Sequence, residues 1–222
     1  MELLIINVLL AAVPSVALVV YFYRRDSGRP EPLALVWQVF LWGFVSVLPA
    51  AIIEQLTEGL LSQLGVASSV LVSSFLVAGL VEELSKFLVV RLFIYHRPAF
   101  DEVTDGIVYT IVAGLGFAFF ENILYSAGPT AIILLRGCTA VPLHAIAAGI
   151  MGYYIGKSRF FSRPQFIRGI AAAVLFHGLY DYLLFGRSWT ALLVIPLLYV
   201  GWRILSNLWQ RARTLDREAG RV

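Results

Sequence analysis

Residues 33–53 read LALVWQVFLWGFVSVLPAAII, a run of 21 residues without Asp, Glu, Lys or Arg. A helix of about 20 apolar residues crosses the roughly 30 Å of hydrocarbon in a bilayer. The whole chain of 222 residues follows this trend, because 59% of it is hydrophobic and only 14% is charged, whereas about 25% of an average soluble domain is charged. Further uncharged runs are Leu3–Tyr23, Gly59–Val81 and Gly137–Gly156. The sequence therefore predicts an integral membrane protein.

Weaker apolar segments raise the number of predicted spans to about seven. We predict an all-α fold, a polytopic transmembrane helix bundle that forms a single domain over residues 1–222. The spans are expected near residues 3–23, 33–56, 66–95, 106–126, 131–156, 168–185 and 189–208. The first is interpreted as a span rather than a cleaved signal peptide, because it lacks a basic leading region and exceeds a typical signal core in length. Pro142 removes a backbone donor inside the fifth span and is expected to kink it.

Basic residues predict the orientation of the bundle. Of the 17 Lys and Arg residues, 14 fall on the side reached after the odd-numbered spans, Arg136 and Arg187 fall on the other side, and Lys86 lies inside a span. By the positive-inside rule the basic side is cytoplasmic, which places the N-terminus outside and the C-terminus inside. We therefore expect a multi-pass protein of the cytoplasmic membrane. The net charge of +3 then reflects topology, so no nucleic-acid partner is expected, and the single cysteine, Cys138, excludes an intrachain disulfide.

Ionisable residues inside the predicted spans mark a candidate site. A charge at mid-bilayer costs roughly 2.5–3.5 kcal/mol on insertion scales, so such residues usually face the bundle interior and serve a function. The ionisable residues found here are Glu82, Glu83, Lys86, Glu121, His144, His177 and Asp181. At a helical rise of about 1.5 Å per residue, five of them lie ~17–22 Å from the cytoplasmic ends of their spans, namely Glu82, Glu121, His144, His177 and Asp181. The sequence therefore predicts one layer of polar side chains drawn from several helices.

Spacing within the helices refines this layer. Glu82 and Lys86 are four residues apart and share a helix face, as do His177 and Asp181. An Asp one turn from a His can accept its ring N–H and orient it, and a Lys can hold a neighbouring Glu ionised. Adjacent Glu82 and Glu83 point about 100° apart and cannot play the same role. A buried salt bridge and interhelical polar contacts are the structural alternatives, but their coincidence at one depth favours a site.

Four short motifs carry a family resemblance. Glu82–Lys86 reads EExxK, Phe117–Asn122 reads FxxxEN, His144 lies in a Pro-Leu-His segment, and His177–Asp181 reads HxxxD. In this order, on successive spans, they resemble the PrsW family of intramembrane proteases, which is distantly related to the type II CAAX prenyl endopeptidases.

The resemblance runs from about Tyr21 to Asp181. Tyr23–Asp26 with Pro30–Pro32 is similar to the segment after the first helix in that family, and Asp105-Gly106 fits the start of the fourth span. CAAX-type relatives favour EExxxR, a His in the second motif and an Asn in the last. The residues found here, Lys86, Glu121 and Asp181, favour the PrsW branch.

The resemblance implies an endopeptidase that cuts in or near the membrane span of another protein. The substrate class it suggests is anti-sigma-factor-like, with cleavage of the site-one type. The expected partners are therefore the lipid bilayer and a membrane-protein substrate with a transmembrane segment.

Two protease mechanisms remain open for these residues. In the first, Glu121, His144 and His177 bind a divalent metal, with zinc expected, because two His and one carboxylate form a familiar catalytic zinc set; Glu82 or Glu83 is then the general base. In the second, no metal is present, and a buried Glu activates water while both histidines stabilise charge. The ligand count favours the metal.

Further residues complete the predicted catalytic group. Lys86 and Asp181 support their one-turn neighbours, and Asn122 is expected to stabilise charge beside the reacting atoms.

A proton-coupled transporter also needs mid-membrane acids, but no repeat relates the two halves of the chain, as it does in many transporters. A catalytically silent scaffold is the remaining alternative, and the intact EExxK motif argues against it.

Overall fold

All regular structure in the described part of the chain is helical. The computed structural model describes residues 2–26, 28–64, 69–161, 163–186 and 189–221. The elements are α1 (Glu2–Arg25), α2 (Leu33–Val45), α3 (Val47–Gln63), α4 (Val70–Val72), the π-helix η1 (Ser73–Gly79), α5 (Leu80–Phe93), α6 (Val103–Tyr125), α7 (Thr130–Cys138), α8 (Ala140–Phe160), α9 (Phe166–Phe185), the 3₁₀ helix η2 (Trp189–Leu193) and α10 (Val194–Glu218). The predicted all-α membrane bundle is confirmed.

Six helical stretches among the described residues are long and apolar enough to cross a membrane. They are Leu3–Arg25, Leu33–Gln63, Val103–Tyr125, Thr130–Phe160, Phe166–Phe185 and Trp189–Glu218. A further stretch, formed by α4, η1 and α5, is of similar length but carries Glu82, Glu83 and Lys86, which lower its mean hydropathy. It corresponds to the third predicted span, whose first residues, 66–68, lie outside the described residues.

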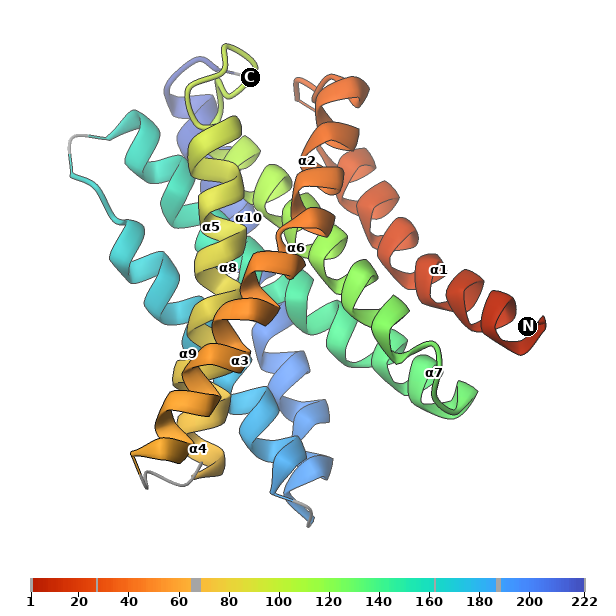
Figure 1. Ribbon diagram of the computed structural model, residues 1–222. Coiled ribbons are helices and arrows are strands. Elements are labelled where there is room, and N and C mark those ends of the chain that lie inside the picture. Colours follow the sequence, from red (N-terminus) through yellow and green to blue (C-terminus); the bar gives the residue numbers. More distant parts are fainter. Residues whose placement is uncertain (1, 27, 65–68, 162, 187–188, 222) are drawn as a thin grey trace.

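Helix α6 forms the centre of the bundle, and α1, α2 and α8 pack against it (Figure 1). Every residue of Val103–Ala118 is buried. Small residues permit close contact with α8, since a Cβ on Gly106 would lie 2.5 Å from the carbonyl oxygen of Gly152. Helix backbones approach this closely in membranes where small residues face each other. The central helix is therefore held in place by backbone contact with α8.

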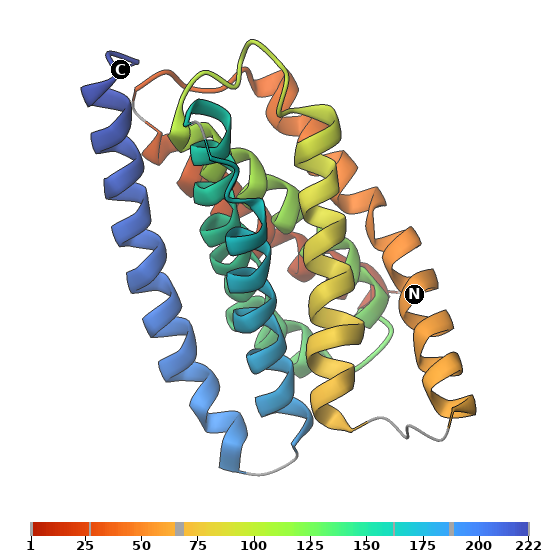
Figure 2. The same cartoon turned by 90° about the vertical axis from the view of Figure 1, so that its left-hand side faces the viewer.

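The outer surface of the bundle is apolar. Leu9 of α1, Leu56 of α3 and Ile195 of α10 are all exposed. Figure 2 shows α10 and α3 at the two sides of the bundle, with α8 and α9 between them. The connections α1–α2, α5–α6 and α8–α9 gather at one end together with the C-terminus (Figure 1). This grouping matches the predicted sorting of basic residues, while the orientation in the membrane stays a prediction.

Two predicted spans differ from the observed helices in a way that matters for the site. The fifth is interrupted at Thr139, between α7 and α8, because Pro142 has no N–H for the carbonyl of Cys138. The second extends to Gln63 instead of ending near residue 56. This extension places Glu54 and Glu58 on a helix wall rather than at a span end.

Candidate active site

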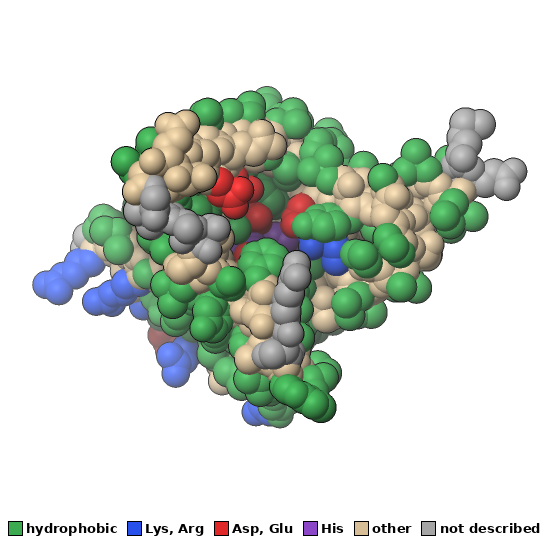
Figure 3. Space-filling view, turned by 60° about the horizontal axis from the view of Figure 1, so that its bottom comes forward, with side chains coloured by type: hydrophobic (Ala, Val, Ile, Leu, Met, Phe, Trp, Pro, Cys, Tyr) green, Lys and Arg blue, Asp and Glu red, His purple; other side chains and the backbone are tan. Residues whose placement is uncertain are grey.

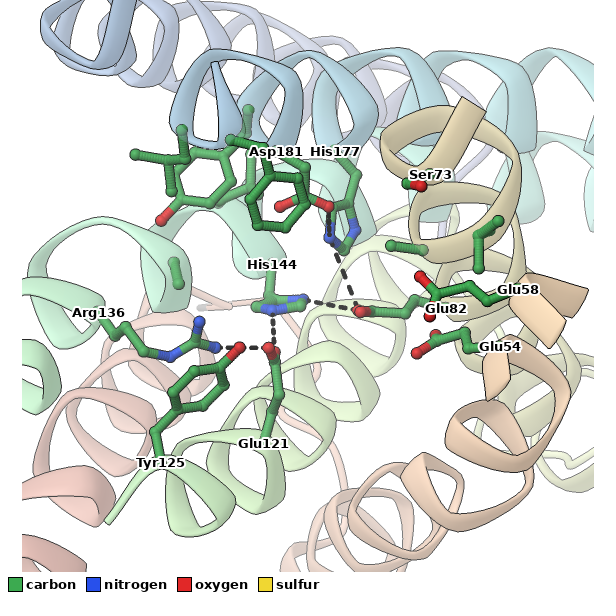
Figure 4. A pocket seen from close by; sticks show the side chains of 17 residues that line it. Glu54, Glu58, Ser73, Glu82, Glu121, Tyr125, Arg136, His144, His177 and Asp181 are labelled. Carbon is green, nitrogen blue, oxygen red and sulfur yellow. Dashed lines mark hydrogen bonds and ion pairs between the residues drawn. The ribbon is translucent and has the colours of Figure 1, made fainter. Parts of the chain in front are cut away.

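A cavity of about 230 Å³ lies near the end of the bundle where α9 meets η2. Figure 3 shows a hollow at this end, with acidic, basic and histidine side chains inside a rim that is largely hydrophobic. The charged and histidine residues that line it come from helices α3 and α5–α9. They are Glu54, Glu58, Glu82, Glu121, Arg136, His144, His177 and Asp181 (Figure 4). The structure thus brings the HxxxD pair, the isolated His and two of the motif glutamates to one cavity.

The helix that carries the EExxK motif begins with a π-helical segment. Leu80 donates its backbone N–H to the carbonyl of Phe75, five residues earlier, and π-turns of this kind are frequent at functional sites. A Cβ on Gly178 would overlap the ring of Phe75, and a Cβ on Gly79 would lie 3.3 Å from the backbone nitrogen of Gly178. These two glycines let η1 and α9 approach closely. The approach sets the first turn of α5 beside His177.

Lys86 is the buried centre of the acidic group. Its Nζ lies 2.7 Å from Oε1 of Glu83 and 3.4 Å from Oε2 of Glu82. The same atom lies 2.8 Å from Nδ1 of His144 and 4.5 Å from the centre of the Phe117 ring. The side chains of Lys86 and Glu83 are 0% exposed, so both lie behind the cavity wall. The cation therefore balances two carboxylates that the bilayer would otherwise exclude.

His177 is held by Glu83 rather than by its one-turn neighbour. Nδ1 of His177 lies 2.7 Å from Oε1 of Glu83. On the opposite side of the ring, Nε2 lies 3.5 Å from Oδ2 of Asp181 and 3.7 Å from Oε2 of Glu82. A carboxylate against one ring nitrogen fixes the tautomer and leaves the lone pair on the other. The other nitrogen of His177, Nε2, therefore faces the cavity beside Glu82 and Asp181.

His144 has a matching arrangement. Its Nε2 lies 3.0 Å from Oε2 of Glu121. Its Nδ1 faces Lys86 and lies 4.0 Å from Oε2 of Glu82. The two imidazole rings are nearly perpendicular, with centroids 5.1 Å apart. Each ring is thus oriented by one carboxylate and turns its other nitrogen toward Glu82 (Figure 4).

The residues present fit a metal ion, although with a different carboxylate from the predicted one. Ligand atoms of Glu82, His144 and His177 lie within 4.8 Å of one another. Zinc bonds of about 2.0–2.1 Å in tetrahedral geometry need ligand atoms roughly 3.3 Å apart, so small movements suffice. The sequence suggested Glu121 as the third ligand, and in the structure Glu121 lies against Nε2 of His144. A metal on Nδ1 of His144 also requires Lys86 to leave that nitrogen.

Arg136 is a site residue that sequence reasoning missed. Its Nη2 lies 2.6 Å from Oε1 of Glu121, and its Nε donates to Oδ1 of Asn122 at 2.8 Å. Its guanidinium also lies over the ring of Tyr125. Asn122, predicted beside the reacting atoms, is fully buried and contacts Arg136 instead. Arg136 lies inside a predicted span, and this position could have indicated a role in the site. The sorting of basic residues by side of the membrane counted it as a loop residue instead.

Glu54 and Glu58 are further cavity residues without a predicted role. Both line the wall formed by α3, and Oε1 of Glu54 is buried without a hydrogen-bond partner among the described residues. Their four-residue spacing places them on one face of a helix. The spacing could have indicated that the two acids belong together. The predicted span ended near residue 56, however, and only the structure shows that α3 continues to Gln63.

Comparisons with known proteins find similar sequences along most of the chain. The family described as "PrsW family intramembrane metalloprotease" matches residues 31–205. A protein named Protease PrsW from Geobacillus kaustophilus is 37% identical over 202 residues, which cover 89% of this chain and 88% of the relative. The Protease PrsW of Bacillus subtilis is 32% identical over 208 residues, covering 91% and 94%. That of Clostridioides difficile is 33% identical over 211 residues, covering 88% and 87%. No solved structure gives a significant match.

Proposed function

Because the chain belongs to the PrsW family of intramembrane proteases, we propose that it hydrolyses peptide bonds in or near the transmembrane segment of membrane-protein substrates. Anti-sigma-factor-like proteins, cut at a first site, are the proposed substrate class, and the cytoplasmic membrane is the proposed location. The observation that carries the proposal is the polar cavity, which is lined by two oriented histidines and several carboxylates. Family membership favours this activity over the transporter and scaffold alternatives.

Glu82, His144 and His177 are the proposed ligands of a divalent metal, with zinc as the expected ion. Two His and one carboxylate suit a catalytic zinc, and the proximity of their ligand atoms supports this set. When bound, such an ion polarises a carbonyl group and makes a bound water more acidic. Glu83 and Glu121 accept from the outer ring nitrogens, which is how carboxylates commonly orient metal-binding histidines.

Asp181 is the carboxylate we propose as general base in this arrangement. Its side chain is 13% exposed, lines the cavity and lies beside the inward nitrogen of His177. Glu83, considered earlier as a base, is fully buried and already contacts both Lys86 and His177 through one oxygen. A base must reach the water that it deprotonates. Glu83 is therefore assigned to positioning His177.

A metal-free mechanism is the second candidate, and the position of Lys86 favours it. Its ammonium group stands against Nδ1 of His144, the nitrogen that also faces Glu82. In this case Glu82 is the base that activates water. Arg136 and the two histidines then stabilise the developing charge, and Asn122 contributes by holding Arg136.

The activity is tested with purified protein in detergent and a reporter peptide that contains one transmembrane segment. Glu82→Gln and His177→Ala are each expected to lower kcat/KM at least about 100-fold, because each removes a group at the reacting centre. Glu58→Gln is the matched control, since Glu58 is an exposed acid on the rim of the cavity. Wild-type cleavage by both active-site variants would show that the site is assigned wrongly.

Metal content separates the two mechanisms. One equivalent of zinc in the purified protein, with loss of activity on chelation and recovery on zinc addition, is the result expected for the metal mechanism. Full activity of metal-free protein in the presence of chelator would instead establish the glutamate-dependent one.

A further inference from the structure

A second group of buried acids lies at the opposite end of α6 from the cavity. Asp26 and Glu31 belong to the α1–α2 connection, while Glu102 and Asp105 stand at the start of α6. They are 5%, 3%, 1% and 0% exposed, respectively. Asp105 is about 24 Å from Glu121 along the helix, at ~1.5 Å per residue. The proposed protease mechanism therefore does not use this group.

Three of these acids converge on one point. Carboxylate oxygens of Asp26, Glu31 and Asp105 lie within 4.8 Å of one another. The hydroxyl of Tyr109 donates to Oε2 of Glu31. Two ionised carboxylates repel each other at such distances. A proton or a cation must therefore stand between them.

Unpartnered oxygens in this group point to a ligand. Oδ2 of Asp26, Oδ1 of Asp105 and Oε1 of Glu102 are buried and have no hydrogen-bond partner among the described residues. The other oxygen of Asp105 is held firmly, because it accepts the backbone N–H groups of Asp101 and Glu102, each at 2.7 Å. Buried polar atoms are nearly always satisfied in folded proteins. A cation with oxygen ligands needs carboxylate oxygens that have no other partner and are fixed in position.

The basic residues Arg29 and Arg221 pair with acids outside this group. Arg29 pairs with the exposed Asp101 at 3.2 Å, and Arg221 lies 3.6 Å from Asp216. Arg213 also lies close enough for its charge to act on Asp26.

We propose that Asp26, Glu31 and Asp105 bind a hard divalent cation such as Ca²⁺ or Mg²⁺, with Glu102 beside them. Carboxylate oxygens are the ligands that these ions prefer. The bound ion joins the α1–α2 connection to the start of the central helix. By the predicted topology this site faces the cytoplasmic edge of the membrane. The proposal is independent of the protease site, because no residue is shared.

Thermal unfolding of the full chain in detergent, after dialysis against chelator, tests the proposal at pH 7.5. Adding Ca²⁺ or Mg²⁺ at about 100 times the dissociation constant is expected to raise Tm by roughly 5–10 °C. Asp105→Asn and Glu31→Gln should each abolish the rise. Asp101→Asn, which removes an exposed neighbouring acid, should retain it, and so should Glu82→Gln, in which the protease site is altered.

In the thermal assay, two results would overturn the proposal. The first is a Tm that changes with neither cation at pH 7.5 yet rises on acidification. The carboxylates would then be neutralised by protons and not by a cation. The second is a cation response that disappears in Glu82→Gln, which would place the ion in the cavity. If the cluster variants do not fold, electron paramagnetic resonance of Mn²⁺ added to the Glu82→Gln protein decides the question. One tightly bound Mn²⁺ per chain supports the site, and only free Mn²⁺ refutes it.

Discussion

The roles of the two histidines in the cavity depend on which residue contacts each nitrogen of their rings. Glu83 contacts Nδ1 of His177 at 2.7 Å, the role that sequence spacing assigned to Asp181. Glu121 contacts Nε2 of His144 at 3.0 Å, although sequence reasoning named it a metal ligand. In both cases the orienting carboxylate comes from another helix. One-turn spacing on a single helix therefore did not reveal these contacts between helices.

Metal retention distinguishes Glu82 from Glu121 as the ligand. Glu82→Gln is expected to lose the bound metal after dialysis, because an amide oxygen is a much weaker zinc ligand than a carboxylate. Glu121→Gln removes only an orienting contact, so metal affinity should fall by about 10–100-fold without being abolished. Zinc titration with a competing chelator measures both. The opposite ranking would restore the ligand set suggested by the sequence.

At the scale of elements, the contact between η1 and α9 positions the glutamates of α5 relative to the histidine of α9. The π-turn directly precedes Glu82 and Glu83, and the glycine contact with α9 brings His177 to them. The interruption at Thr139 has a similar effect, since it redirects α7 from α8. Arg136 on α7 can then reach Glu121 on α6. Irregular backbone is thus concentrated in the helices that border the cavity.

Gly178→Ala tests whether this contact matters for activity. The new Cβ would overlap the ring of Phe75, so η1 and α9 must separate. A displacement of about 1 Å at reacting groups can lower rates ~100-fold, and we expect a fall in kcat of roughly 10–100-fold. Gly59→Ala is the control, because nothing lies within 4 Å of its added Cβ. Unchanged kcat in Gly178→Ala, with the same helical circular dichroism, would contradict this role.

At the scale of the whole molecule, α6 connects the cavity to the acidic group, and α10 secures its start. Asp216 of α10 accepts the backbone N–H groups of Val103 and Thr104, at 2.7 and 3.0 Å. It also accepts the hydroxyl of Thr104 at 2.8 Å. The first turn of a helix has unsatisfied N–H groups that such an acid caps. The C-terminal helix therefore stabilises the beginning of the helix that carries Glu121.

Asp216→Ala is expected to reduce the free energy of unfolding by about 1–3 kcal/mol, because it leaves buried N–H groups without an acceptor. Denaturant titration in mixed micelles provides the measurement. The control is Glu218→Ala, which removes an exposed acid from the same helix and should change stability by less than about 0.5 kcal/mol. Equal stability of both variants would mean that α10 does not support α6.

Local properties of the chain were enough to predict the helices and their membrane setting. A span depends on the length and apolarity of one run, and a charged residue inside it, such as Lys86, is visible without knowing its neighbours. Depth along a helix follows from residue counting, so Glu121, His144 and His177 could be placed in one layer. Their arrival at a single cavity agrees with that prediction.

Only the tertiary structure decided which atoms meet. Residue counting leaves an error of about 5 Å in depth because span ends shift by several residues, whereas a hydrogen bond needs atoms within about 3 Å. Rotation about the helix axes and the packing of glycines therefore made Glu82 the carboxylate between the histidines. The same packing moved Arg136 to Glu121 and joined Asp26 to Asp105 across 79 positions of sequence. The sequence thus showed which spans carry ionisable residues, while the packing of the helices decided which ionisable groups meet.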